Sequence, residues 1–138
     1  MSKQNMNIVK NFYQFVASGN ASGVLSLLHD DLHWTEAEGF PYYSGTWRKP
    51  QDVVERLLVP LMRDWSDFSA KADDYMADGE RVVAFGVYAG TAKATGKSMR
   101  VPFAHLWRVR DHKITHFDMF TDTLLVHRAY KGGDCTAM

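Results

Sequence analysis

The stretch Val101-Pro-Phe-Ala-His-Leu-Trp-Arg-Val-Arg-Asp-His-Lys-Ile114 decides the fold. Apolar residues recur in it at every second position, interrupted by His105, which is the period of a half-buried β-strand. This strand is expected to run from Met99 to Arg110, and Asp111-His112 is expected to turn the chain into a last strand over residues 113–123. The predicted inward face of the first strand comprises Met99, Val101, Phe103, His105, Trp107 and Val109.

A period of two also marks the chain before this stretch, from Phe68 onward. Asp78-Gly79 has the composition of a two-residue hairpin turn. Residues 82–95 are expected to form a long strand, in which Gly86 and Gly90 indicate bends or bulges.

Helical spacing of apolar residues predicts three helices, over residues 8–16, over residues 24–28 and from Pro50 onward. Pro60 is expected to kink or end the third helix because it lacks an amide donor. A half-buried strand is expected from Leu32 to Glu36. Helices followed by a run of strands define an α+β class. We expect the N-terminal helices to pack in the concave face of a strongly curved antiparallel sheet, leaving a hollow for a small molecule.

Composition excludes several functional classes. The 138 residues fit one domain, and 46% of them are hydrophobic, which is typical of a globular chain. Lys plus Arg equals Asp plus Glu, 16 against 16, so the basic surface of a nucleic-acid binder is not expected. No apolar run approaches a membrane span and no signal peptide is evident, so a cytoplasmic protein is expected. The single Cys135 lies in a tail predicted to be flexible from about residue 131.

The segment Trp34-Thr-Glu-Ala-Glu-Gly-Phe-Pro-Tyr-Tyr-Ser-Gly-Thr-Trp47 sets two carboxylates among five large aromatic residues. A carboxylate that loses water becomes a stronger base. Glu36 follows apolar strand positions and is the best candidate for a catalytic base. The alternative is that Glu36 lies at the rim and pairs with Arg48 in solvent, and Glu38 is expected to be solvated.

Three further polar residues are candidates for the site. His105 on its apolar strand face could donate a hydrogen bond or shuttle a proton, or be a satisfied core residue. Asp118 is a candidate catalytic carboxylate on the last strand, or else pairs with Arg108 or His116. Asp122 could reach the pocket or cap the strand end. The remaining predicted substrate-binding residues, which could equally be plain core, are Trp34, Tyr42, Tyr43, Trp47, Phe103, Trp107 and Phe120.

A metal site is not expected. His105, His116 and Asp118 are conceivable ligands, but no tight ligand spacing supports them. No cofactor-binding motif is evident either, since the Gly86–Gly90 segment belongs to a strand.

The segments Phe12–Asp31, Trp34–Thr46, Pro50–Val59, Asp78–Val83 and Val101–Thr123 resemble the NTF2-like superfamily, in its SnoaL-like and ketosteroid-isomerase-related branch. The resemblance implies a cone of curved sheet closed by helices, and a homodimer through the outer sheet face, where Pro102 and Leu106 lie. It places Glu36 at the position of the isomerase base and His105 at that of a protonated acid. Phe12 falls where an oxyanion-binding tyrosine would be, with Tyr13 adjacent.

The functional hypothesis is a cofactor-free enzyme that uses carboxylate general acid/base chemistry on a small apolar or aromatic substrate bearing a carbonyl. Isomerase, cyclase, lyase and hydratase or hydrolase outcomes all fit it. The alternative is a non-catalytic module that binds an apolar ligand or serves dimerisation.

Overall fold

The computed structural model describes residues 2–43 and 45–131, so the tail predicted from about residue 131 and its Cys135 lie outside the described residues. The helical elements are α1 (Ser2–Ala17), α2 (Ala21–Leu27), α3 (Pro50–Val53), the π-helical turn η1 (Val54–Leu58), α4 (Val59–Asp64) and α5 (Thr123–Lys131). The strands are β1 (Leu28–Thr35), β2 (Thr46–Trp47), β3 (Trp65–Asp78), β4 (Arg81–Ala92), β5 (Ser98–Arg110) and β6 (Lys113–Thr121). None of the described helices has the length and apolar character needed to cross a membrane.

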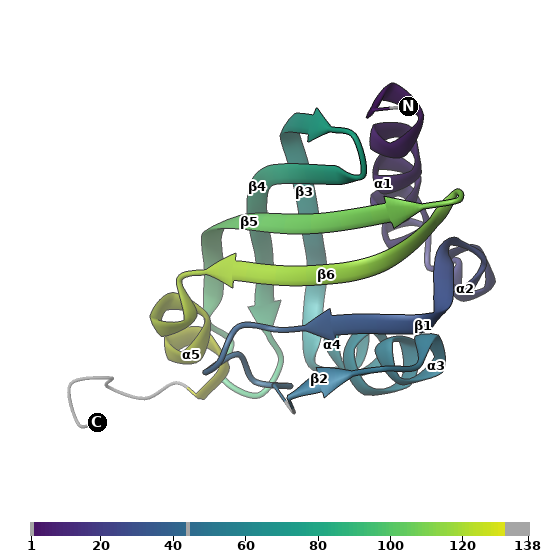
Figure 1. Ribbon diagram of the computed structural model, residues 1–138. Coiled ribbons are helices and arrows are strands. Elements are labelled where there is room, and N and C mark those ends of the chain that lie inside the picture. The colour runs from purple at the N-terminus through teal and green to yellow at the C-terminus, as the bar shows by residue number, and fades with distance from the viewer. Residues whose placement is uncertain (1, 44, 132–138) are drawn as a thin grey trace.

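A single six-stranded sheet carries the architecture, in the order β2-β1-β6-β5-β4-β3. Figure 1 shows the sheet curving around α1, α3 and α4, which lie on one side of it. The α+β class and the cone-like arrangement are therefore confirmed. The sheet is mixed rather than wholly antiparallel, because β1 joins β6 in parallel while the other neighbours are antiparallel.

Glycines in β4 let the sheet bend. An added Cβ on Gly86 would lie 2.0 Å from the carbonyl oxygen of Lys71, and the β3–β4 register shifts next to it, between Ala72 and Asp74. A second register shift, between Ser66 and Ser69, lies beside Gly90. Bulges therefore occur beside both glycines, as predicted, but the extra residue at each lies on the facing strand β3 rather than on β4.

The third helical segment continues past Pro60 to Asp64. Before the proline the helix widens into η1, in which the amide of Val59 bonds to the carbonyl of Val54, five residues earlier. A proline ring crowds the preceding turn of an α-helix and removes one hydrogen bond. The predicted kink therefore takes the form of a π-helical turn, a common site of helix distortion.

The core fills the space between sheet and helices. Aromatic rings dominate it, with Trp34 and Trp107 almost fully buried and packed edge to face at 5.6 Å between ring centroids. Phe12 on α1 contacts both indoles. The inward face predicted for β5 is confirmed, because its buried residues include Met99, Val101, Phe103, His105, Trp107 and Val109.

Candidate functional site

Glu36 is a carboxylic acid inside the protein. It follows the last residue of β1, and only 3% of its surface is exposed. Oε2 accepts a hydrogen bond of 2.9 Å from the indole Nε1 of Trp34, two positions earlier on the same side of the chain. Oε1 is buried and has no hydrogen-bond partner among the described residues. Burial raises the pKa of Glu36 to about 8, although the Trp34 bond lowers it in part.

The alternative placement of Glu36 at the rim is wrong. Arg48 pairs instead with Asp31, at 2.7 Å between Nη2 and Oδ1, and its Nε donates to the carbonyl of Leu32. Glu38, two residues beyond Glu36, is exposed as expected.

His105 is buried between two tyrosines. Its Nδ1 lies 2.5 Å from the hydroxyl of Tyr13 on α1, and its Nε2 lies 2.5 Å from the hydroxyl of Tyr88 on β4. The ring also stacks on Phe103, with 4.0 Å between centroids. Burial lowers the pKa of His105 well below its ordinary value, so the imidazole is neutral at physiological pH.

A neutral imidazole has one donor and one acceptor nitrogen, so the two tyrosines play opposite roles. The hydroxyl oxygen of Tyr13 already accepts from the indole Nε1 of Trp107 at 3.2 Å. If Tyr13 then donates to Nδ1, Nε2 carries the proton and donates to Tyr88. In that tautomer the hydroxyl proton of Tyr88 is left free for a ligand.

One cavity brings these groups together. It has a volume of about 40 Å³, and the residues that line it include Tyr13, Glu36, Tyr88 and His105. The charge of Glu36 contributes, after burial, to raising the pKa of Tyr88 well above its ordinary value, so the two groups interact. An unpaired carboxyl oxygen and a hydroxyl donor in one apolar cavity can hold a ligand oxygen and exchange a proton with it.

Tyr13 and Tyr88 were not among the residues predicted for the site. Tyr13 shares with Val9, Phe12 and Val16 the spacing of one helix face, so helical periodicity could have placed it inward. Tyr88 occupies the same strand face as the buried Val82 and Ala84. Phe12 also lines the cavity, but it is the Tyr13 hydroxyl that reaches His105.

Asp118 and Phe120 do not reach the cavity, and their predicted place in it is wrong. Arg108 pairs with His116 whereas Val109 pairs with Ile114, so β6 contains one extra residue at Thr115. This bulge reverses the alternation beyond it. Phe117 and Met119 consequently face inward, whereas Asp118 lies on the outer face and Phe120 is 57% exposed there.

Asp122 likewise lies away from the cavity. Its Oδ1 accepts from the amide of Leu125 at 3.3 Å, at the start of α5. The last strand was expected to continue to residue 123, but β6 ends at Thr121 and a helix follows. The alternative that Asp122 has a capping role is therefore correct, but it caps the start of helix α5 and not the end of the strand.

The predicted aromatic residues fall into two groups. Trp34 lines the cavity, while Phe103 and Trp107 stand behind it, contacting His105 and Tyr13. The others lie elsewhere. Tyr42 donates to Asp64 at 2.8 Å, and Tyr43 is 41% exposed. Trp47 is buried, and its Nε1 has no hydrogen-bond partner among residues 2–43 and 45–131.

The conceivable metal ligands lie on opposite sides of the sheet. His105 faces inward, whereas His116 lies on the outer face, where its ring stacks on His33 at 4.7 Å. Within residues 2–43 and 45–131, no group of three or more His, Cys, Asp or Glu side chains is placed to hold a metal ion.

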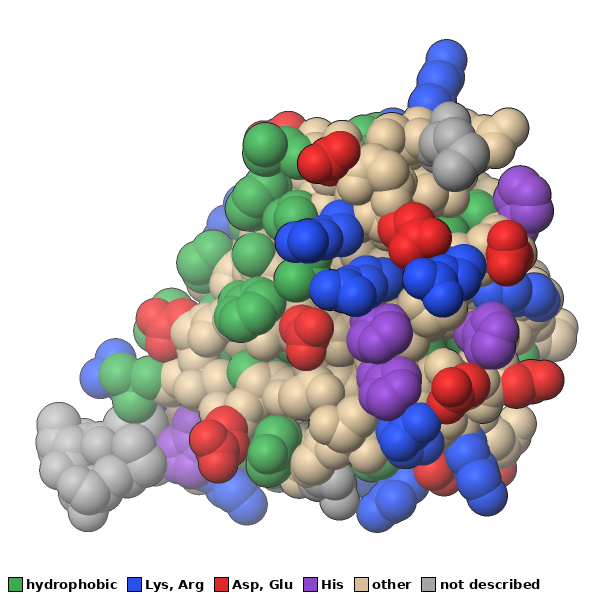
Figure 2. All heavy atoms as spheres, viewed as in Figure 1, with side chains coloured by type: hydrophobic (Ala, Val, Ile, Leu, Met, Phe, Trp, Pro, Cys, Tyr) green, Lys and Arg blue, Asp and Glu red, His purple; other side chains and the backbone are tan. Residues whose placement is uncertain are grey.

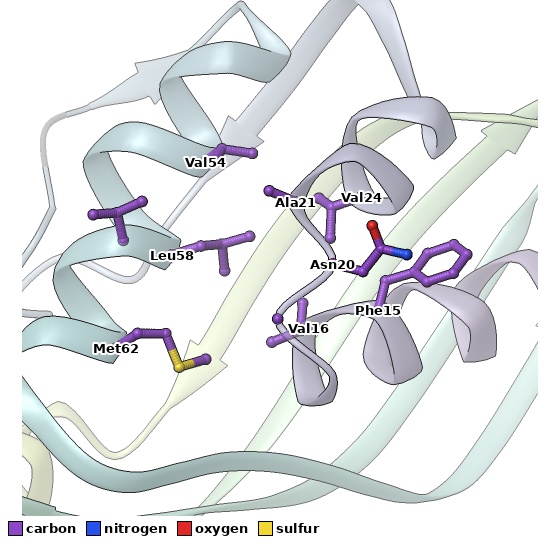
Figure 3. Close-up of a pocket in the computed structure, with 10 residues that line it drawn as sticks. Phe15, Val16, Asn20, Ala21, Val24, Val54, Leu58 and Met62 are labelled. Carbon is purple, nitrogen blue, oxygen red and sulfur yellow. The ribbon is translucent and has the colours of Figure 1, made fainter.

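A second, larger pocket adjoins the cavity. It has a volume of about 200 Å³ and lies between the α1–α2 side and the η1–α4 side of the helical layer. Figure 3 shows Val54, Leu58 and Met62 projecting toward it from one side, and Val16, Ala21 and Val24 from the other. Its lining is almost wholly apolar.

Comparison with known proteins defines the class. The SnoaL-like domain is matched by residues 9–117, so this chain belongs to the SnoaL-like domain family. The resemblance predicted from the sequence is thereby confirmed. No curated protein sequence matches the chain with significance.

Solved structures agree with this assignment. An NTF2-like protein from Burkholderia thailandensis is 35% identical, with a TM-score of 0.86, covering 91% of this chain and 95% of that chain. An NTF2-like protein of Burkholderia pseudomallei is 26% identical, with a TM-score of 0.83, covering 94% of this chain and 98% of that chain. TerC, co-crystallised with polyporic acid, is 26% identical, with a TM-score of 0.80, covering 91% of this chain and 97% of that chain.

Proposed function

We propose that this protein binds a small apolar molecule bearing a carbonyl group and that Glu36 moves a proton at the carbon next to it. The observation that carries the proposal is the unpaired Oε1 of a buried carboxyl in the same cavity as the His105–tyrosine group. An unpaired polar atom in an apolar interior is costly and calls for a function. The relative TerC was crystallised with polyporic acid, which supports a small-molecule ligand here.

The proton transfer uses side chains of this chain. The Glu36 carboxylate takes the proton from the α-carbon. The electron pair of that C–H bond forms a carbon–carbon double bond, and the π pair of the carbonyl moves onto its oxygen. The Tyr88 hydroxyl, supported by His105, donates to the enolate oxygen that forms. The protonated Glu36 then returns a proton to the same or another carbon, which leaves the protein unchanged.

The raised pKa of Glu36 suits this role. With a pKa of about 8, about a tenth of the carboxyl is ionised at pH 7, and its conjugate acid is close to the working pH. General acid/base catalysis is most effective when the catalytic pKa lies near the operating pH.

Exchange of carbon-bound hydrogen for deuterium tests the proposal. The probe is 2-tetralone in D₂O, whose α-proton signals are followed by NMR with and without protein. We expect the wild type to accelerate exchange, with a rate that rises with pH up to about 8 and then levels. Glu36→Gln should lose this acceleration. Glu38→Gln, a matched change at an exposed carboxylate two residues away, should keep it. Equal rates for wild type and Glu36→Gln would refute the proposal.

A non-catalytic binding module is the second candidate. A protonated Glu36 is favoured below pH 8 and can donate a hydrogen bond to a ligand without giving up its proton. In that case Glu36→Gln, which keeps a donor and an acceptor, should leave 2-tetralone binding within a few-fold of wild type, and no protein variant should accelerate exchange.

A homodimer through the outer sheet face is part of the same proposal. Cross-strand register aligns Phe85, Ala104 and Phe120 on β4, β5 and β6, and Met76 lies exposed on β3. Figure 2 shows hydrophobic side chains gathered toward one side of this face, with charged and histidine side chains on the other. Burying such a patch against a second copy would remove several large apolar side chains from water.

A further inference from the structure

The cavity of Glu36 and the outer pocket share a wall. Val16, near the end of α1, and Leu58, the last residue of η1, line both hollows. Both side chains are only partly buried. In Figure 3 the two face the outer pocket from opposite sides, Val16 from α1 and Leu58 from η1. These two side chains therefore form a partition between an inner and an outer compartment.

The inner compartment alone is too small for an organic ligand. A cavity needs roughly 10–15 Å³ to hold one water, so about 40 Å³ accommodates a few waters and no ring. Typical small-molecule pockets have roughly 300–1,000 Å³. Any organic ligand that reaches Glu36 must therefore displace part of the wall and occupy adjoining space, and the outer pocket provides about 200 Å³ of it.

The partition lies where the backbone can yield. Leu58 ends a π-helical turn whose hydrogen bonds span five residues, and such turns are commonly found at functional sites. Val16 is the penultimate residue of α1, and helix termini have fewer intrahelical bonds. A small outward shift of these side chains would join the two compartments.

The lining of the outer pocket specifies what it accepts. Phe15, Val24, Val54 and Met62 are apolar, and the side-chain oxygen of Asn20 is already occupied by the amide of Gly23 at 2.9 Å. Among the residues that the structure describes, no charged one lines it. The occupant is therefore an alkyl or aryl group, because a charged group would lose its water and could gain only the side-chain amide nitrogen of Asn20 as a partner.

We propose that the two compartments form one ligand site, gated by Val16 and Leu58, for a molecule with a compact oxygen-bearing ring beside Glu36 and an apolar substituent in the outer pocket. The position of the ring rests on the proposed function. The position of the substituent rests on the shared wall, the two volumes and the apolar lining.

Binding of cyclohexanone, 4-ethylcyclohexanone and 4-pentylcyclohexanone tests this inference. Calorimetric titration of the wild type should show affinity rising about fourfold for each added methylene, the equivalent of ~0.8 kcal/mol, until the outer pocket is full. Ala21→Trp fills the pocket from its α2 wall. This variant should weaken the binding of 4-pentylcyclohexanone far more than that of cyclohexanone and so lose the gain with chain length.

Met62→Trp fills the same pocket from α4 and should have the same effect if Ala21→Trp does not fold. Leu58→Ala thins the partition and should speed cyclohexanone association several-fold, whereas Val59→Ala, which changes the outer pocket alone, should not. An affinity independent of chain length, or a full chain-length gain in both tryptophan variants, would overturn the inference. The proposed function can fail independently of this inference. In that case deuterium exchange would not respond to Glu36→Gln, but affinity would still rise with chain length.

Discussion

The indole of Trp34 donates to the carboxyl of Glu36 over 2.9 Å, and both residues are almost fully buried. This is the one hydrogen bond that the structure shows for the Glu36 side chain within the described residues. It favours the ionised carboxyl, whereas burial favours the neutral one, and burial is the larger effect. The apolar surroundings of Glu36 therefore raise its proton affinity, and the hydrogen bond from Trp34 lowers it by a smaller amount.

Removing that donor should raise the pKa of Glu36 further. Trp34→Phe keeps an aromatic ring but loses the N–H, so we expect the carboxyl to titrate above pH 8, shifted by about one pKa unit for a charge-assisted bond worth ~1.5 kcal/mol or more. The measurement is carbon-13 NMR of the Glu side chain against pH. Trp47→Phe is the control, because within the described part of the chain the buried N–H of Trp47 has no hydrogen-bond partner. An unchanged titration in Trp34→Phe would contradict the assignment.

The raised pKa also predicts how stability varies with pH. A folded-state pKa of about 8 against an ordinary value near 4.5 means that the folded protein binds more protons than the unfolded chain between these values. The free energy of unfolding should consequently fall as pH rises through this window. His105, neutral when folded, acts oppositely below pH 6.5, because there the unfolded chain gains the proton.

The effect of Glu36 is isolated between pH 6.5 and 8. Over this range we expect the wild type to lose about 1.6 kcal/mol of unfolding free energy, because the slope of ~1.4 kcal/mol per pH unit falls off as the pH approaches the pKa. Urea unfolding measures it. Glu36→Gln should show a nearly flat profile and exceed the wild type at pH 8. A wild-type profile that is equally flat would show that Glu36 is not held neutral.

The two tyrosines beside His105 should contribute differently to the free energy of unfolding. Tyr13→Phe leaves both the Trp107 N–H and His105 Nδ1 without a partner, whereas Tyr88→Phe leaves only His105 Nε2. Each buried group that loses its partner costs about 1–3 kcal/mol. Urea unfolding at pH 7 should therefore rank Tyr13→Phe as the less stable variant.

Deuterium exchange should rank the same variants in the opposite order. Tyr88 is the donor proposed for the enolate oxygen, and loss of such a donor typically slows a reaction by about 10²–10³-fold. Tyr13→Phe should slow it less, because Tyr13 acts through His105. If Tyr13→Phe slowed exchange more than Tyr88→Phe, Tyr88 would not be the donor to the enolate oxygen.

The sequence predicted the architecture well because periodicity reports burial directly. The alternation in β5 brought His105 inside, and the apolar neighbours of Glu36 indicated a buried carboxyl. The bulge at Thr115 has no sequence signal comparable to Gly86. Alternation counted through it groups Asp118 and Phe120 with the buried Ile114, and the apolar Phe117 and Met119 left the inward face of this strand undecided. Bulges at ordinary residues are set by pairing with neighbouring strands, which local sequence does not encode.

The tyrosine partners of His105 show a different limit. Tyr13 and Tyr88 come from a helix and a strand 75 positions apart, and no pattern within either segment links them. Only the packing of α1 into the sheet brings both hydroxyls to one ring. The small volume of the cavity depends in the same way on how the surrounding side chains pack, which composition does not determine.

Gly86 should tolerate no side chain. Its added Cβ would lie 2.0 Å from a backbone oxygen of Lys71, whereas the Cβ of Gly90 would lie 3.3 Å from the nearest atom, the Cα of Phe68. We expect Gly86→Ala to cost about 3 kcal/mol or more, as overpacking against backbone does, and Gly90→Ala to cost clearly less. Thermal and urea unfolding of the two variants check this order, and equal losses would mean that the β3 bulge can shift.

The protein should form a homodimer through the outer face of its sheet. Light scattering at micromolar concentration should give about 31 kDa, twice the 15.7 kDa of one chain. Phe120→Asp puts a charge into the row of Phe85, Ala104 and Phe120, and burying that charge against a second copy would be costly. This variant should therefore be monomeric. Val59→Asp changes an equally exposed apolar residue that instead lines the outer pocket in the helical layer, so it should stay dimeric. A monomeric wild type would refute the dimer, and a dimer disrupted by Val59→Asp but not by Phe120→Asp would place the interface elsewhere.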